Sequence, residues 1–308
     1  MIELSVIIPI SEFHDPIEEL YREYRNGIDS TGLTYEFLYV IDGDHPDALK
    51  ELNELADSEN ITIIKLTTKF GESTALNVAF GKSQGRILLT LPAYRQIDAT
   101  EIPKLVAALD HCDMALARRY PRKDSLFNRT QSALFNSLLG YTTDLKIHDA
   151  GCGARALKRN VIDEVQIYGD LHRFMSVIAH RQGFRVEEVN ITQSSQNISR
   201  RIYSPGVYIR RLLDLLTVFF LLKFTKKPLR FFGLVGLTVF SAGFITTLYL
   251  IAERLFFDIG LSDRPALFLS SLLIVLGVQI IAIGLIGEII IFTHARRIKE
   301  YTIDKIIN

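Results

Sequence analysis

Arginine side chains are the groups in this sequence whose chemistry is easiest to name. A guanidinium binds phosphate through paired, charge-assisted hydrogen bonds, and a fixed positive charge stabilises negative charge that develops during a reaction. The run Arg118–Lys123, "RRYPRK", could act in this way, or it could be a solvated loop or a patch against an anionic membrane surface. The candidate phosphate-binding residues are Arg95, Arg118, Arg119, Arg122, Arg129, Arg155, Arg200 and Arg201.

Two aspartates stand where a ligand could be bound. Asp42 ends the apolar segment "YEFLYVID", and Asp149 lies in the loop "HDAGCGAR". Each could instead be an ordinary turn residue, since aspartate readily accepts hydrogen bonds from nearby backbone amides. His148 and His172 have no partners at metal-ligand spacing, so we expect both to be ordinary polar residues.

The elements that must position these residues alternate along the chain. Apolar segments that predict buried strands are "LSVIIP", "YEFLYVI", "ITIIKL" and "RILLTL", and helical segments separate them. This alternation predicts an α/β domain with a doubly wound, mainly parallel sheet and helices on both faces. Ligands of such sheets bind beyond the carboxyl ends of the strands, so residues 9–12, 42–44 and 91–98 should line one crevice.

Two long apolar segments follow this domain. They run from about Phe231 to Ala252 and from about Ala266 to Phe292, and each is long enough to cross a bilayer. Glu288 is the one charge in the second segment, expected at an interface or between helices. Lysine and arginine gather outside both segments, which places the large domain in the cytosol. The predicted division is a large cytosolic α/β domain at 1–200, an amphipathic juxtamembrane connector at 201–230, a transmembrane hairpin at 231–292 and a basic cytosolic tail at 293–308.

Composition narrows the possible partners. The 35 Lys and Arg residues balance 35 Asp and Glu residues, which argues against a nucleic-acid partner bound through bulk positive charge. Cys112 and Cys152 are too few for a disulfide framework and are expected to be reduced thiols. The N-terminus has no basic region followed by an apolar run, so no cleaved signal peptide is expected.

A series of segments, in order, resembles the family-2 glycosyltransferases, and within them the polyprenyl-phosphate hexose transferases of the dolichyl-phosphate mannose synthase and GtrB type. "LSVIIPISE" resembles the opening strand of that family. "VIDGDHPD" resembles its Asp-Asp-Gly-Ser loop, with Ile41 in place of the first aspartate. "FGESTALNVAFGKSQG", "ALARRY", "DAGCGAR", "LHRF", "GFRVEEV" and "KPLRFFGL" are similar to its later landmarks. The resemblance covers nearly the whole chain. It implies a GT-A-type fold for the α/β domain and a glycosyltransferase-like role for residues 1–200.

The resemblance implies roles for particular residues. Donor binding would fall to Pro9, Ser11, Glu12, Asp42, Gly71, Tyr94 and Gln96. The acceptor phosphate would be bound by Arg119, Arg129, Ser132, Arg200 and Arg201. Asp149, Arg95 and Arg155 would act at the reacting centre.

One segment departs from the family pattern. The family reads Asp-Ala-Asp-Leu-Gln-Asp-Pro-Pro-Glu where this chain has "PAYRQIDATEIPKL", so Pro92 and Tyr94 occupy the two metal-carboxylate positions. Neither is a good ligand for Mg²⁺ or Mn²⁺, which prefer anionic oxygens, and Asp98 alone could supply one carboxylate. No metal ligand is therefore predicted, although Mg²⁺ or Mn²⁺ could still be held in another way. Arg95 is expected to reach the donor diphosphate as a substitute positive charge, giving slower, EDTA-tolerant transfer.

The expected activity is transfer of a sugar, with inversion, from a nucleotide-sugar donor to a polyprenyl phosphate such as undecaprenyl or dolichyl phosphate. The reaction would occur at the cytoplasmic face of the inner (plasma) membrane, in a multi-pass and homo-oligomeric protein serving cell envelope polysaccharide synthesis or protein glycosylation. Two alternatives stay open. The chain could be a catalytically silent membrane scaffold or partner subunit, or a related transferase with an altered donor, acceptor or metal ligation.

Overall fold

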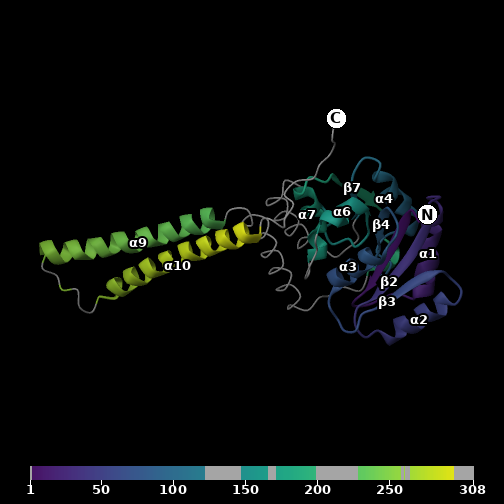
Figure 1. Cartoon of the computed structure of the whole chain (residues 1–308), viewed down its shortest axis with the longest axis horizontal. Helices are drawn as coiled ribbons and strands as arrows, with labels where there is room; N and C mark the ends of the chain where they lie inside the picture. The colour runs from purple at the N-terminus through teal and green to yellow at the C-terminus, as the bar shows by residue number, and fades with distance from the viewer. Residues whose placement is uncertain are drawn as a thin grey trace. The chain divides into compact units, whose positions relative to one another are not determined.

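The computed structural model describes residues 2–121, 147–165, 171–198, 228–257, 260 and 264–294 (Figure 1). The chain divides into two compact units, an α/β unit and a helical unit, which are described separately. Some predicted features lie outside the described residues: the acceptor residues Arg129, Ser132, Arg200 and Arg201, the connector up to residue 227, and the tail from residue 295.

A seven-stranded sheet forms the centre of the α/β unit, with the strand order β3-β2-β1-β4-β6-β5-β7. All neighbouring strands are parallel except β6, which runs antiparallel to both β4 and β5. The mainly parallel sheet predicted from the sequence is therefore confirmed. The strands are β1 (Leu4–Ile10), β2 (Tyr35–Ile41), β3 (Ile61–Lys65), β4 (Ile87–Thr90), β5 (Met114–Arg119), β6 (Arg155–Lys158) and β7 (Val186–Ile191).

Helices cover both faces of the sheet. Helices α1 (Ile17–Asp29), α2 (Pro46–Ala56) and α4 (Ile102–Ala108) share one core with alternate residues of β1 and β2. Helix α3 (Glu72–Lys82) also packs against β1 and β2. It does so on the other face of the sheet, because alternate residues of a strand point to opposite faces. Shorter elements are η1 (Ala99–Glu101), α6 (Arg159–Glu164), η2 (Leu171–Phe174), α7 (Met175–Arg181) and η3 (Ser195–Ile198).

Helix α1 packs unusually closely against the segment that follows β4. A Cβ atom added to Gly27 of α1 would lie 2.1 Å from the carbonyl oxygen of Ala99, the first residue of η1. Because the obstacle is backbone, no side-chain rotation can relieve the overlap. The absence of a side chain at Gly27 thus permits the close approach of α1 to the loop between β4 and α4.

We expect Gly27→Ala to destabilise the α/β unit by about 1–3 kcal/mol or more, since the added methyl group must push α1 away from η1. Gly81→Ala is the matched control, because Gly81 also lies in a helix and an added Cβ would meet no atom within 4 Å. That control should stabilise the protein by up to about 1 kcal/mol through helix propensity. Urea unfolding of the detergent-solubilised full chain measures both changes; equal effects would contradict the close packing.

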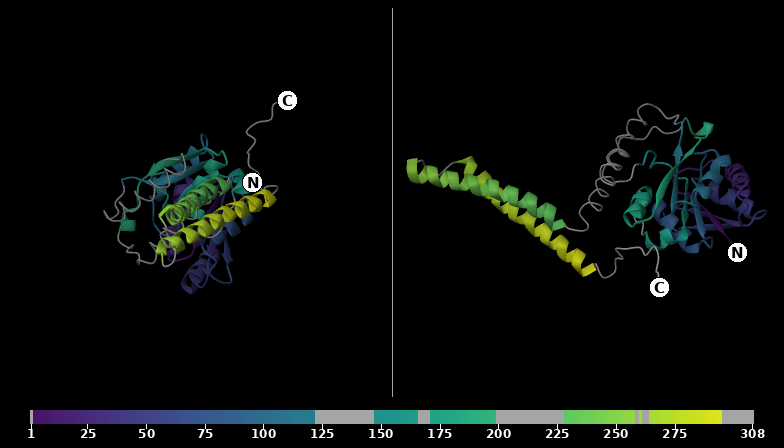
Figure 2. Two further views of the ribbon diagram at one scale, coloured as in Figure 1. Left: turned by 90° about the vertical axis from the view of Figure 1, so that its left-hand side faces the viewer. Right: turned by 90° about the horizontal axis from the view of Figure 1, so that it is seen from above.

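The second unit is a pair of helices, α9 (Pro228–Phe257) and α10 (Pro265–His294), which lie side by side in both views (Figures 1 and 2). Both helices are long and apolar enough to cross a membrane. Gly236 and Gly277 allow the two backbones to approach, since a Cβ on either glycine would lie under 3 Å from backbone of the other helix. Large apolar side chains such as Leu237 and Phe268 point outward and are exposed, as lipid-facing side chains are.

Glu288 of α10 makes a contact between these two helices. Its Oε2 accepts a hydrogen bond from the backbone nitrogen of Leu229, at the start of α9, over 3.4 Å. The first backbone N–H groups of a helix have no partner within that helix, so a carboxylate is well suited to this position. Of the two alternatives for Glu288, the structure favours the inter-helix contact.

Candidate active site

The crevice predicted from the sequence would be at the carboxyl ends of β2, β1 and β4, which are neighbours in the sheet. The backbone N–H of Asp42 donates to the carbonyl of Ile10, and that of Leu91 donates to Ile7, so these three strand ends stay in register. Ser11 follows β1 here. Within the described part of the chain its hydroxyl oxygen is buried and has no hydrogen-bond partner. A buried hydroxyl normally has a hydrogen-bond partner. A polar group of a bound ligand could be that partner for Ser11.

Asp42 is fully buried at the end of β2. Its Oδ1 accepts a hydrogen bond from the backbone N–H of Phe70 over 2.7 Å, and its Oδ2 accepts one from Gly71 over 2.9 Å. Gly71 has a φ of 98°, a conformation that favours glycine, and is the residue before α3. The carboxylate of Asp42 therefore shapes the turn that leads into α3 at the edge of the crevice.

The loop after β4 brings an aromatic pair to the same edge of the sheet. The rings of Tyr94 and Phe13 have centroids 4.6 Å apart, and Phe13 is 39% exposed. Gln96 is fully buried; its Nε2 donates to the hydroxyl of Tyr94, and its Oε1 accepts from the backbone N–H of Gly153 over 2.8 Å. Gln96 therefore connects this loop to the loop that carries Asp149.

The sequence predicted that Arg95 would reach the diphosphate of the donor. The structure instead places its side chain against helix α1. Its guanidinium donates to Glu23 over 2.8 Å and to Glu19 over 2.9 Å, and the residue is only 7% exposed. Burial alone would lower the pKa of Arg95, but the hydrogen bonds and charges of Glu23, Glu19 and Asp15 outweigh burial and raise it. The sequence signal we missed is the spacing of Asp15, Glu19 and Glu23, which repeats every four residues and aligns three carboxylates.

The residues of this loop do not fit a divalent ion. Pro92 has no side-chain donor, and the hydroxyl of Tyr94 already interacts with Gln96. The carboxylate of Asp98 accepts hydrogen bonds from the backbone and side chain of Thr100, at the start of η1. Among the residues that the structure describes, no group of three or more His, Cys, Asp or Glu side chains could hold a metal. No chemical step is therefore assigned to a metal.

Arg119 and Asp149 form a buried ion pair. Nε of Arg119 lies 2.7 Å from Oδ2 of Asp149 and its Nη2 lies 2.8 Å from Oδ1, while the two residues are 5% and 4% exposed. Glu188 of β7 accepts hydrogen bonds from the backbone N–H groups of His148 and Asp149, which fastens this loop to the sheet. The sequence marked Arg119 as an acceptor residue and Asp149 as a catalytic one. The structure makes them partners.

Arg155 and His172 make a second buried connection. Arg155, 6% exposed, donates hydrogen bonds to the carbonyl oxygens of Cys152 and His172. The Nδ1 of His172 lies 3.0 Å from Oγ of Ser73, and its Nε2 lies 3.3 Å from Oε2 of Glu72. His172 was expected to be an ordinary polar residue. Its polar contacts link η2 to the start of α3, and no local sequence pattern reveals this link.

Cys152 is not suited to act as a nucleophile. Its side chain is buried, and burial followed by the charge of Asp149 raises the pKa of the thiol to about 11. A thiol needs to lose its proton before it attacks, so Cys152 stays unreactive at neutral pH.

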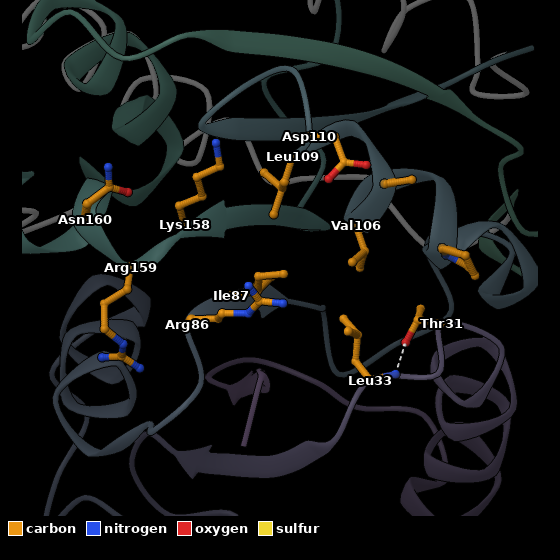
Figure 3. A pocket seen from close by; sticks show the side chains of 12 residues that line it. Thr31, Leu33, Arg86, Ile87, Val106, Leu109, Asp110, Lys158, Arg159 and Asn160 are labelled. Carbon is orange, nitrogen blue, oxygen red and sulfur yellow. Dashed lines mark hydrogen bonds between the residues drawn. The ribbon is translucent and has the colours of Figure 1, made fainter. Parts of the chain in front are cut away.

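A cavity of about 610 Å³ lies away from these residues, at the amino ends of the parallel strands (Figure 3). Apolar side chains such as Ile87 and Leu109 line it, together with the cations Arg86, Lys158 and Arg159. Each cation already has a protein partner: Arg86 pairs with Glu3, Lys158 with Asp113, and Arg159 donates to backbone carbonyls. The cavity contains none of the predicted site residues, so the crevice at the carboxyl ends remains the candidate active site.

Comparison with known proteins finds relatives that match this chain over nearly its whole length. The chain is 29% identical to undecaprenyl-phosphate 4-deoxy-4-formamido-L-arabinose transferase of Proteus mirabilis, over 99% of this chain and 94% of that protein. It is 28% identical to dodecaprenyl-phosphate galacturonate synthase of Rhizobium johnstonii, over 96% of this chain and 89% of that protein.

Solved structures share the fold of the α/β unit. Glucosyl-3-phosphoglycerate synthase of Mycobacterium tuberculosis aligns with a TM-score of 0.52 and 14% identity, covering 70% of this chain and 78% of that one. Mannosyl-3-phosphoglycerate synthase of Rubrobacter xylanophilus aligns with a TM-score of 0.52 and 13% identity, covering 71% and 74%. The family model described as glycosyl transferase family 2 matches residues 5–166, more than half of the sequence, and the chain therefore belongs to glycosyl transferase family 2.

Proposed function

We propose that this chain transfers a sugar from a nucleotide-sugar donor to a polyprenyl phosphate. The observation that carries the proposal is the nearly end-to-end match to two relatives named as undecaprenyl-phosphate and dodecaprenyl-phosphate sugar enzymes. The match includes the pair of apolar helices, and these would keep the protein in the membrane where such a lipid resides.

The crevice at the carboxyl ends of β1, β2 and β4 would bind the donor. Ser11 would supply its unpartnered hydroxyl, and Phe13 with Tyr94 would supply an aromatic surface against a base or sugar ring. Asp42 and Gly71 would shape the wall beside them. Pro9 and Glu12, on either side of Ser11, are proposed to complete the donor site.

The acceptor phosphate is already ionised at neutral pH, so the reaction needs no general base to remove a proton from it. Its oxygen would displace the nucleoside diphosphate in line, which inverts the configuration at the sugar carbon. The buried pair of Arg119 and Asp149 would hold the acceptor side of the crevice in shape. Arg155 would fix the neighbouring loop through its contacts with Cys152 and His172. The remaining acceptor residues in this proposal are Arg129, Ser132, Arg200 and Arg201.

We propose a multi-pass inner-membrane location with the α/β unit in the cytosol. Lys226, Lys227 and Arg230 precede the first apolar segment and Arg296 and Arg297 follow the second, as the positive-inside rule requires for two cytosolic flanks. The connector at 201–230 would lie at the membrane surface, and the protein would assemble as a homo-oligomer. Its product would serve cell envelope polysaccharide synthesis or protein glycosylation.

A second candidate function is that of a catalytically silent membrane scaffold. The observation that favours it is the poor fit of Pro92 and Tyr94 to the divalent ion that their positions imply. A scaffold would need neither donor binding nor lipid phosphate.

Sugar transfer by the full chain in lipid nanodiscs tests the proposal. The protein is incubated with single nucleotide sugars and undecaprenyl phosphate, with and without EDTA, and the lipid product is identified by mass spectrometry. We expect one donor to give a sugar-phosphate lipid, and reactions without the lipid phosphate to give none. Absence of product with every donor, in EDTA and in added Mg²⁺ or Mn²⁺, would favour the scaffold.

A further inference from the structure

The loop between β4 and η1 is anchored at successive residues by other parts of the chain. The hydroxyl of Tyr24, on α1, contacts the carbonyl oxygens of Pro92 over 2.9 Å and Tyr94 over 3.2 Å. The backbone N–H of Asp15 donates to Ala93, and Oδ2 of Asp15 accepts from the backbone N–H of Arg95 over 2.8 Å. These contacts hold the backbone of the loop through groups that belong to the chain itself.

The side chain of Arg95 completes this attachment. Its Nε and Nη2 bind Glu23 and Glu19, and its Nη1 lies 3.8 Å from Asp15. A planar guanidinium with several donors can join separate carboxylates in a fixed orientation, which lysine cannot do. The loop is thereby held along one side of α1 by a cation that belongs to the chain itself. We call Arg95 with Asp15, Glu19 and Glu23 the α1 clasp.

The other end of the loop is attached to the segment that precedes β6. Gln96 contacts the backbone of Gly151 and Gly153, in the loop that also carries Asp149. Tyr94 lies between the two attachments, with its hydroxyl bound by Gln96 and its ring against Phe13. Both attachments therefore determine where the aromatic surface of Tyr94 stands.

We propose that the α1 clasp replaces a divalent ion in this chain as the device that orders the donor-binding loop, so that nucleotide binding needs no metal. Arg95 is a positioning residue: it acts through the placement of Tyr94 and Gln96 and does not touch the donor. A loop that is ordered before binding loses less conformational entropy when the ligand arrives, which increases affinity. The proposal rests on the proposed function for the identity of the ligand and on the geometry above for the role of the clasp.

Hydrogen exchange of the ligand-free full chain in detergent tests the ordering directly. In excess EDTA we expect peptides covering residues 91–98 to be protected in the wild type. Arg95→Ala should speed their exchange by about tenfold or more, because the loop then opens more often. Protection that appears in the wild type only after Mg²⁺ or Mn²⁺ is added would overturn the proposal.

Binding of nucleoside diphosphates tests the consequence for the donor. UDP, GDP, CDP and ADP are titrated separately by calorimetry, in excess EDTA and in excess MgCl₂. The nucleotide that binds should do so with the same affinity, within about twofold, in both conditions, and Arg95→Ala should weaken it by about tenfold or more. Arg95→Lys should recover part of the loss, since an ammonium can still bind one of the carboxylates. Loss of binding in EDTA, or unchanged binding by Arg95→Ala, would overturn the proposal.

Two further variants keep the test decisive. Arg22→Ala removes an exposed arginine of the same helix, paired with Glu18, and should leave both measurements at wild-type values. Glu23→Gln removes one charge from a half-exposed partner of Arg95, so it should raise exchange of the loop without unfolding the domain, even where Arg95→Ala does not fold. Should no nucleotide bind, the exchange measurement alone decides. If hydrogen exchange and nucleotide binding both give the expected results but no sugar reaches the lipid, only the proposed transferase function fails.

Discussion

Replacing Arg119 with alanine is expected to lower the free energy of unfolding of the α/β unit by about 3–5 kcal/mol. The reason is that Asp149, itself only 4% exposed, would keep a buried charge and lose both guanidinium hydrogen bonds. Sugar transfer should fall with it, because the loop that carries Asp149 would then be held to β5 only by the backbone N–H of residue 119, which donates to Oδ2 of Asp149 over 3.2 Å. Urea unfolding followed by circular dichroism measures the change on the detergent-solubilised full chain.

The neighbouring arginine of the same strand is the control. Arg118 is half-buried and lies over the ring of Tyr120, 5.5 Å from its centroid, so Arg118→Ala should cost less than about 1 kcal/mol. The double variant Arg119→Ala/Asp149→Ala should be less destabilised than the sum of the two single variants, since it leaves no unpaired buried charge. If Arg119→Ala keeps wild-type stability and loses only lipid binding, Arg119 contacts the acceptor directly and the ion pair has little structural weight.

Replacing Asp42 with alanine is expected to damage both stability and donor binding. The backbone N–H groups of Phe70 and Gly71 would lose their charged acceptor, and a hydrogen bond to a charged group contributes about 1.5–3 kcal/mol. The turn before α3 would then move, and nucleotide affinity should fall with it. This differs from the expectation for a carboxylate that contacts only a nucleotide, where affinity falls and stability is kept. Urea unfolding and calorimetry with nucleoside diphosphates separate the two effects.

Two comparisons sharpen this prediction. Asp42→Asn keeps one carbonyl acceptor and should lose about half as much stability as Asp42→Ala. Asp44→Ala changes an exposed carboxylate of the same loop and should stay within about 0.5 kcal/mol of the wild type. Asp42→Ala with a wild-type unfolding curve and weakened nucleotide binding would show that the turn does not depend on this carboxylate.

The sequence by itself determined the features that depend on local pattern. Short apolar runs separated by helical segments were enough to predict a mainly parallel sheet, because a strand buried on both faces needs apolar residues at successive positions. Asp42 and the segment from Leu91 to Asp98 could be assigned to one edge of the sheet, because parallel strands place their carboxyl ends together. The two membrane-spanning helices were predicted from the length of two apolar segments with almost no charge.

Only the tertiary structure decided which partner each charged side chain has. The sequence predicted that Arg95 and Arg119 bind phosphate. In the fold each arginine pairs with a carboxylate from a distant part of the chain: Arg95 with Glu23, and Arg119 with Asp149. His172 likewise meets Ser73, which is 99 positions away. The physical reason is that a guanidinium binds phosphate and carboxylate in nearly the same way, so its residue type leaves the choice open. A buried guanidinium needs a charged or polar partner nearby. Packing between distant segments of the chain determines which partner that is.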